Sequence, residues 1–119
     1  FIKMDGPAVY QFAVNTIVKT VQTCLTQAGL TEKDIDLFIP HQANSRIVNY
    51  AAQKLGLADS QVKVNLDRIG NTSSASIPIV MDELNRAGGI KRGDLVVAVG
   101  FGAGLTWGSC LIRWYTRQR

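Results

Sequence analysis

The stretch Leu95-Val96-Val97-Ala98-Val99 limits most strongly what this chain can fold into, because all of its residues are apolar. A strand with one face in water alternates between apolar and polar residues, whereas a strand that is apolar throughout is covered on both faces. We therefore expect residues 95–99 to form a central strand with helices packed on both sides of its sheet. This arrangement is a three-layer α/β fold.

The rest of the chain alternates between strand and helix patterns. Apolar runs and period-two alternation predict strands at residues 1–4, 35–39, 62–66, 95–99 and 106–115. Apolar residues three and four positions apart predict helices at residues 7–28, 43–55 and 78–86. The expected order is β-α-β-α-β-α-β-β, a mostly parallel mixed sheet whose final strand runs antiparallel to its neighbour.

Three unusual segments follow predicted strands. His41, the only histidine of the chain, comes directly after the strand that ends at Pro40, and Asn71 follows the strand at 62–66. The glycine-rich segment Gly100–Gly104 follows the strand at 95–99. Right-handed crossovers bring the ends of parallel strands to one edge of a sheet, and open α/β sheets bind ligands at that edge. We therefore expect a functional site there.

His41 and Asn71 can act together as hydrogen-bond donors. A neutral imidazole and an amide each offer an N–H without net charge, and two such donors aimed at one carbonyl oxygen form an oxyanion hole. The segment Gly100–Gly104 could bring a main-chain N–H close to a ligand. Structural roles remain open for all three: a packed histidine, a turn or cap asparagine, and a plain hairpin turn.

The cysteines offer no obvious chemistry at this edge. Cys24 and Cys110 have apolar neighbours and no metal-ligand spacing, so we expect both in the core and no metal site. Neither cysteine lies at a strand-to-helix turn. The residues alone therefore point to no nucleophile.

Composition limits the class of partner. The apolar fraction is 46%, which suits a packed globular domain, and the net charge of +4 suggests an acidic partner. The basic residues are not interleaved with aromatic ones as in a nucleic-acid groove, so no nucleic acid is expected. No apolar segment reaches the roughly 18 residues of a membrane span. A soluble cytoplasmic protein that binds no membrane is the expectation.

Three motifs resemble one known family. They are Ile39-Pro40-His41-Gln42-Ala43-Asn44, the run from Asn65 to Pro78 that contains Gly70-Asn71-Thr72-Ser73, and Gly100-Phe101-Gly102-Ala103-Gly104-Leu105-Thr106-Trp107-Gly108-Ser109. With these motifs in order, essentially the whole chain resembles the C-terminal half of β-ketoacyl-acyl-carrier-protein synthase III, a condensing enzyme with the thiolase fold. The predicted element order is also that of one thiolase half.

The resemblance implies an acyltransferase. In that family a cysteine of the N-terminal half takes an acetyl group from acetyl-CoA or another acyl-CoA primer. Malonyl-acyl-carrier-protein then loses its carboxylate, and the resulting enolate attacks the acyl-enzyme, which starts fatty acid synthesis. No cofactor beyond these substrates is implied, and the implied partners are acyl carrier protein, the N-terminal half and a second copy in a homodimer.

The same resemblance implies roles at the reacting centre. His41 and Asn71 would bind the malonyl thioester oxygen, and Phe101 would line the site beside the leaving carboxylate. Ala103 would give a backbone N–H to the acyl-enzyme oxygen. Many relatives have glycine at this last position, but we expect the difference to matter little because only the main chain acts.

Two further residues are implied at the substrate entrance. Asn44 would lie along the pantetheine channel, and Arg46 near its mouth would meet the acidic carrier protein. The alternative for Arg46 is an exposed helix charge without a partner.

The catalytic cysteine and the N-terminal half of the family are missing, so residues 1–119 are expected to be a C-terminal thiolase-like domain that is inactive alone. Residues 1–4 alternate like a strand without any lead-in, as if cut from a longer chain. Two alternatives are a non-catalytic thiolase half that binds acyl carrier protein or CoA, and a polyketide-type synthase of the same fold.

The wide apolar stripe of the first helix predicts that this helix is mostly buried.

Overall fold

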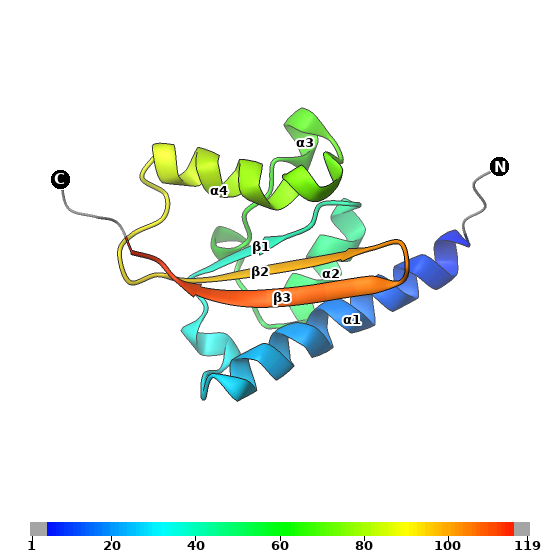
Figure 1. Cartoon of the computed structure of the whole chain (residues 1–119), viewed down its shortest axis with the longest axis horizontal. Helices are drawn as coiled ribbons and strands as arrows, with labels where there is room; N and C mark the ends of the chain where they lie inside the picture. The colour runs from blue at the N-terminus through cyan, green and yellow to red at the C-terminus, as the bar shows by residue number, and fades with distance from the viewer. Residues whose placement is uncertain (1–4, 116–119) are drawn as a thin grey trace.

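The computed structural model describes residues 5–115, so the strand predicted at residues 1–4 lies outside the described part. One mixed sheet of three strands organises that part (Figure 1). Its middle strand β2 (Leu95–Gly102) pairs in parallel with β1 (Leu37–Pro40) and antiparallel with β3 (Thr106–Arg113). The predictions of a central strand and of a final antiparallel strand are confirmed.

Helices cover both faces of this sheet. In Figure 1, α1 (Gly6–Gln27) and α2 (Ser45–Lys54) lie on one side of the strands, and α4 (Ser76–Arg86) lies on the other. No helix of residues 5–115 is long and apolar enough to cross a membrane. The three-layer prediction therefore holds for the described residues.

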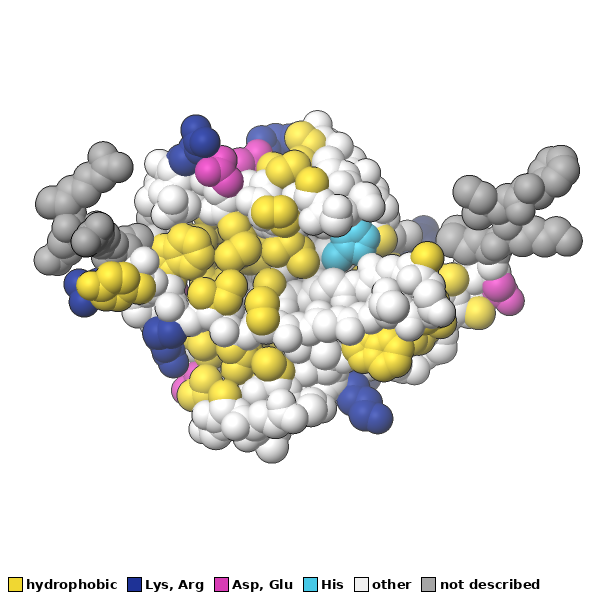
Figure 2. All heavy atoms as spheres, in the orientation of Figure 1, with side chains coloured by type: hydrophobic (Ala, Val, Ile, Leu, Met, Phe, Trp, Pro, Cys, Tyr) yellow, Lys and Arg dark blue, Asp and Glu magenta, His cyan; other side chains and the backbone are white. Residues whose placement is uncertain are grey.

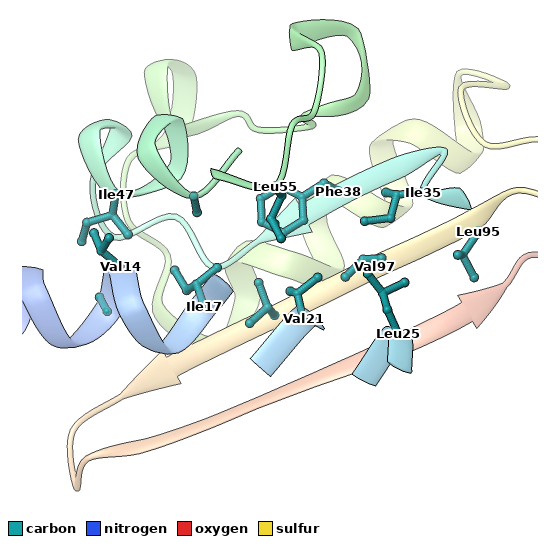
Figure 3. Packing of buried hydrophobic residues seen from close by; sticks show 13 residues of the cluster. Val14, Ile17, Val21, Leu25, Ile35, Phe38, Ile47, Leu55, Leu95 and Val97 are labelled. Carbon is teal, nitrogen blue, oxygen red and sulfur yellow. The ribbon is translucent and has the colours of Figure 1, made fainter. Parts of the chain in front are cut away.

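The period-two geometry of strands divides the core into two clusters. Phe38 of β1 and Val97 of β2 point to the side of α1 and α2, where they pack with Ile17 and Ile47 (Figure 3). The next residues in each strand, such as Val96, belong to the second cluster beneath α4. Successive side chains point to opposite faces, so a strand that is buried on both faces must be apolar throughout.

Helix α1 begins and ends where its sequence predicts. The Asp5 side chain accepts a hydrogen bond from the Ala8 N–H at 3.1 Å, and Pro7 lies in the first turn, where its missing N–H costs nothing. Gly29 follows the helix with φ of 68°. Only one stripe of α1 is fully buried, consisting of Ala13, Val14, Ile17, Val21 and Leu25. The prediction that α1 is mostly buried is therefore too broad.

The predicted strand at residues 62–66 is wrong. Val62 forms a single parallel bridge with Phe38, and the Lys63 N–H donates to the Phe38 carbonyl at 2.9 Å. Pairing then stops, because the Asn65 N–H donates to the side chain of Gln42 instead of to a neighbouring strand. The chain continues into the short helix α3 (Leu66–Ile69).

Other element boundaries shift by a few residues. Helix α2 begins at Ser45 because Asn44 caps it, and α4 begins at Ser76, two residues before Pro78. The segment predicted as a glycine-rich loop is mostly strand, since Gly100 to Gly102 continue β2 and pair with Gly108 to Thr106. The hairpin turn is confined to residues 103–105.

The cysteine prediction is only partly correct. Cys24 on α1 is half-buried, but Cys110 is exposed. Cys110 lies on β3, which is an edge strand of the described sheet, and its side chain points away from the face on which Ser109 and Leu111 contact α1 and its cluster. An apolar strand pattern does not reveal that a strand lies at an edge.

An apolar surface remains beside α4. Figure 2 shows hydrophobic side chains gathered between α4 and the strands. Five partly buried residues pack around the second core cluster there, namely Ile77, Met81, Leu84, Ile112 and Trp114. This surface remains because α4 alone covers its face of the sheet, whereas α1 and α2 share the other.

We expect that the 119-residue chain by itself does not persist as a monomer, because exposed apolar patches of this kind favour association. Analytical ultracentrifugation at low micromolar concentration should show self-association, together with binding of a hydrophobic dye. A Met81→Glu variant, which places a charge in the patch, should reduce both signals. A monomeric chain that binds no dye would contradict the expectation.

Candidate functional site

His41, Asn71 and Phe101 line one hollow of about 740 Å³. His41 directly follows β1, and its backbone N–H donates to the Val99 carbonyl at 2.7 Å, which extends the β1–β2 pairing by one residue. Phe101 lies near the end of β2. The hollow is therefore at the carboxyl edge of the two parallel strands, where the sequence predicts a site.

The His41 ring is held by two neighbours. Its Nδ1 lies 2.6 Å from the hydroxyl oxygen of Ser76, and its ring meets the Phe101 ring edge to face with centroids 5.3 Å apart. Burial lowers the pKa of His41 below its ordinary value of 6.5, because a desolvated imidazolium is disfavoured. The ring is therefore neutral at pH 7 and carries one N–H.

The Asn71 side chain stabilises a turn and also lines the hollow. Its Oδ1 accepts a hydrogen bond from the Ser73 N–H at 2.8 Å. Ser73 has a φ of 55°, a left-handed backbone conformation that residues other than glycine rarely adopt. The turn uses the amide oxygen, so the Nδ2 amino group is the half of Asn71 that can donate to a ligand. The turn interpretation and the donor interpretation are thus compatible.

Gln42 connects the segments that form the hollow. Its side chain is completely buried, with Oε1 accepting from the Asn65 N–H at 2.7 Å and Nε2 donating to the Ser76 carbonyl at 3.3 Å. One side chain therefore joins the loop after β1 to the segment before α3 and to the start of α4. Sequence reasoning missed Gln42 and Ser76, and their only signal was proximity to His41 and Asn71 in the motifs.

A second anchor holds the segment that leads to Asn71. Glu83 of α4 accepts hydrogen bonds from Arg68 Nη2 at 2.6 Å and from Asn65 Nδ2 at 3.2 Å. These hydrogen bonds, with that of Arg68 the largest cause, lower the pKa of Glu83. The pair is exposed to solvent, so it orients the segment more than it stabilises the fold.

The other candidate residues lie outside the lining of the hollow. Ala103 is exposed in the hairpin turn, and its carbonyl accepts from the Thr106 hydroxyl at 3.1 Å. Asn44 caps α2, with its Oδ1 accepting from the Arg46 N–H at 2.8 Å. Arg46 is exposed in the first turn of α2. The structure thus brings together His41, Asn71 and Phe101 but not Ala103, Asn44 or Arg46.

The lining of the hollow is uncharged. Neutral polar side chains, glycines and apolar residues face it, and no Asp, Glu, Lys or Arg is among them in the described part of the chain. Within residues 5–115 no group of three His, Cys, Asp or Glu side chains is placed to hold a metal ion. The chemistry that this arrangement can supply is hydrogen-bond donation by neutral groups.

Comparison with known proteins decides the family. The family model described as 3-oxoacyl-[acyl-carrier-protein] synthase III C terminal matches residues 25–114. The chain belongs to this family. It is 52% identical over 114 residues to the β-ketoacyl-[acyl-carrier-protein] synthase III of Symbiobacterium thermophilum, an alignment that covers 96% of this chain and 34% of the relative. The chain therefore spans about a third of the relative's length.

Solved structures give the same assignment. The synthase III from Thermus thermophilus superposes with a TM-score of 0.91 at 48% identity, over 95% of this chain and 35% of that one. The synthase III from Aquifex aeolicus gives a TM-score of 0.92 at 42% identity, over 96% and 37% of the two chains. The synthase III domain described here is thus an α/β half of a thiolase fold.

We predict that Gln42→Ala lowers the free energy of unfolding by about 1–3 kcal/mol, because it leaves the buried Asn65 N–H without an acceptor. Gln53→Ala, an exposed position on α2, is the matched control and should change stability by less than about 0.5 kcal/mol. Chemical denaturation of the protein that carries this domain measures both. Equal effects of the two substitutions would show that Gln42 does not tie the loops together.

Proposed function

We propose that this domain is the carbonyl-activating half of an enzyme that joins an acyl-CoA primer to malonyl-acyl-carrier-protein and so starts fatty acid synthesis. The observation that carries the proposal is the placement of His41 and Asn71 on one uncharged hollow, in a chain that belongs to the synthase III family. Relatives with that printed activity are about three times as long as this chain. The rest of the enzyme would supply the remaining chemistry.

His41 and Asn71 would act on the malonyl thioester. The bond between its carboxylate and its α-carbon breaks, carbon dioxide leaves, and the electron pair becomes an enolate whose negative charge lies on the thioester oxygen. Two neutral N–H donors stabilise that oxygen as charge develops, and preorganised donors of this kind contribute roughly 10²–10³ in rate each. Phe101 keeps one wall of the hollow apolar beside the departing carboxylate.

The enolate carbon then attacks the carbonyl carbon of an acyl-cysteine, and the cysteine sulfur leaves as a thiolate. Neither Cys24 nor Cys110 lines the hollow, so the nucleophile would come from the N-terminal part of the complete enzyme. The main-chain N–H of Ala103 would stabilise the oxygen of the acyl-enzyme. A methyl side chain at this position does not remove that donor, since the N–H belongs to the main chain.

The carrier protein would approach along the first turn of α2. Arg46 is exposed there and offers a charge to an acidic partner, while Asn44 beside it caps the helix and would border the pantetheine channel. The complete enzyme would act as a cytoplasmic homodimer. Rim charges of this kind mainly affect the rate and the salt dependence of association.

A related function has a specific observation in its favour. The priming β-ketosynthase from the R1128 polyketide biosynthetic pathway superposes with a TM-score of 0.83 at 38% identity, over 92% of this chain and 34% of that one. A starter enzyme of polyketide synthesis would use the same pair of donors. Turnover with different acyl-CoA primers and carrier proteins distinguishes the two functions.

In the complete enzyme, His41→Ala and Asn71→Ala should each reduce malonyl decarboxylation by roughly 10²–10³, because each removes one oxyanion donor. Transfer of the acyl group from CoA to cysteine should survive, since that step uses another donor. Decarboxylation is followed by release of labelled carbon dioxide, and acyl transfer by labelling of the protein.

Asn71→Asp separates the two roles of this side chain. It keeps an oxygen that can accept from the Ser73 N–H but lacks the amino donor, so decarboxylation should fall as far as in Asn71→Ala. If Asn71→Asp retained activity that Asn71→Ala loses, Asn71 would be a turn residue only. Equal loss of acyl transfer and decarboxylation would likewise indicate a structural role.

Arg46→Glu should weaken binding of acyl carrier protein more than binding of CoA substrates, and the difference should shrink as salt rises. Lys33→Glu is the matched control, because Lys33 is exposed but precedes β1 and so lies at the opposite edge of the sheet. Surface plasmon resonance at several ionic strengths measures the effect. If both classes of substrate lose affinity equally at every ionic strength, Arg46 does not dock the carrier protein.

A further inference from the structure

The contact between Ser76 and His41 has no task in the reaction described above. Ser76 is the first residue of α4, and it is only 1% exposed. Its hydroxyl oxygen lies 2.6 Å from His41 Nδ1, which is a short hydrogen bond between side chains 35 residues apart in the sequence. A neutral histidine has two tautomers, and this contact bears on which of them is present.

The direction of the hydrogen bond follows from the surroundings of the hydroxyl. If Nδ1–H donated to the serine oxygen, the serine proton would need another acceptor. Among the described residues His41 is the one hydrogen-bond partner of that hydroxyl, and the burial of Ser76 keeps water away. A buried donor without an acceptor is costly, whereas an unused lone pair on a hydroxyl is not. The hydroxyl therefore donates, and Nδ1 accepts.

Ser76 is itself held in place. Its carbonyl accepts from Gln42 Nε2 at 3.3 Å, and its N–H donates to the carbonyl of Ser73. On the other side of the imidazole, the edge-to-face contact with Phe101 restrains the plane of the ring. A ring restrained in this way has little freedom to exchange Nδ1 for Nε2 by rotation.

We propose that Ser76 is a positioning residue, whose hydroxyl donates to His41 Nδ1 and thereby holds the ring as the tautomer that carries its single proton on Nε2. The ring N–H of His41, on Nε2, then faces the hollow and does not donate to Ser76. The consequence for catalysis rests on the proposed function, whereas the tautomer assignment can be tested without it.

The tautomer is measured by nitrogen NMR of the imidazole. Segmental labelling of this domain within the complete protein leaves His41 as the one labelled histidine, because the chain contains no other. The parent protein should show a protonated Nε2 and an unprotonated, hydrogen-bonded Nδ1. In Ser76→Ala the ratio of the tautomers should shift about 5–10-fold toward Nδ1–H, which is the change in equilibrium constant expected from the loss of one hydrogen bond.

Two further variants complete this measurement. Ser76→Thr keeps a hydroxyl and should retain the parent tautomer. Ser109→Ala removes a different serine hydroxyl, which donates to the Thr20 carbonyl at 3.2 Å, and should leave the His41 spectrum unchanged. A protonated Nδ1 in the parent protein, or a ratio that does not respond to Ser76→Ala, would overturn the proposal.

The kinetic readout distinguishes positioning from a merely structural role. Ser76→Ala should lower malonyl decarboxylation about 5–10-fold, with Ser76→Thr restoring it and with acyl transfer unchanged. An equal loss of both steps would overturn the positioning role. If the tautomer responds as expected but His41→Ala leaves decarboxylation intact, the assignment of Ser76 stands and the proposed function fails.

Discussion

The burial of β2 on both faces is the constraint on which the rest of this structure depends. Val96 and Val97 are both fully buried, yet they belong to different clusters on opposite sides of the sheet. Removing one such side chain from water contributes about 1.5–3 kcal/mol, so neither face can be left uncovered without a large loss. Helices must therefore lie on both sides, and this requirement decides where each connecting segment crosses the sheet.

The site is a consequence of that layering. Since β1 and β2 run parallel, the loop after β1 and the end of β2 meet at one edge, and the start of α4 reaches the same edge from above. Gln42 then fixes the relative positions of these segments, because its buried side-chain amide accepts from the Asn65 N–H, which no strand or helix satisfies, and donates to the Ser76 carbonyl at the start of α4. The neutral donors of His41 and Asn71 thus face one hollow although 29 residues separate them in the sequence.

Much of this arrangement can be predicted from residue patterns. The all-apolar run at 95–99, the helical spacing of α1 and the proline after residue 39 indicate the central strand, a long helix and the position of His41. The failures have physical reasons that lie outside the local pattern. Residues 62–66 alternate like a strand, but the amide oxygen of Gln42 takes the Asn65 N–H that a neighbouring strand would need. The glycines at 100 and 102 are typical of a loop, but these residues pair with β3 and so belong to the strand β2.

The sequence by itself determined the order of most elements, the central place of β2, the family and the candidate pair His41 and Asn71, because each depends on short-range periodicity or on contiguous motifs. Only the tertiary structure decided that Cys110 is exposed, that Ser76 touches His41, and that the buried Gln42 joins three segments. The last two features depend on contacts between residues whose sequence numbers differ by 23 to 35. A hydrogen bond requires partners within about 3 Å at a suitable angle, and no pattern along the chain encodes such a distance.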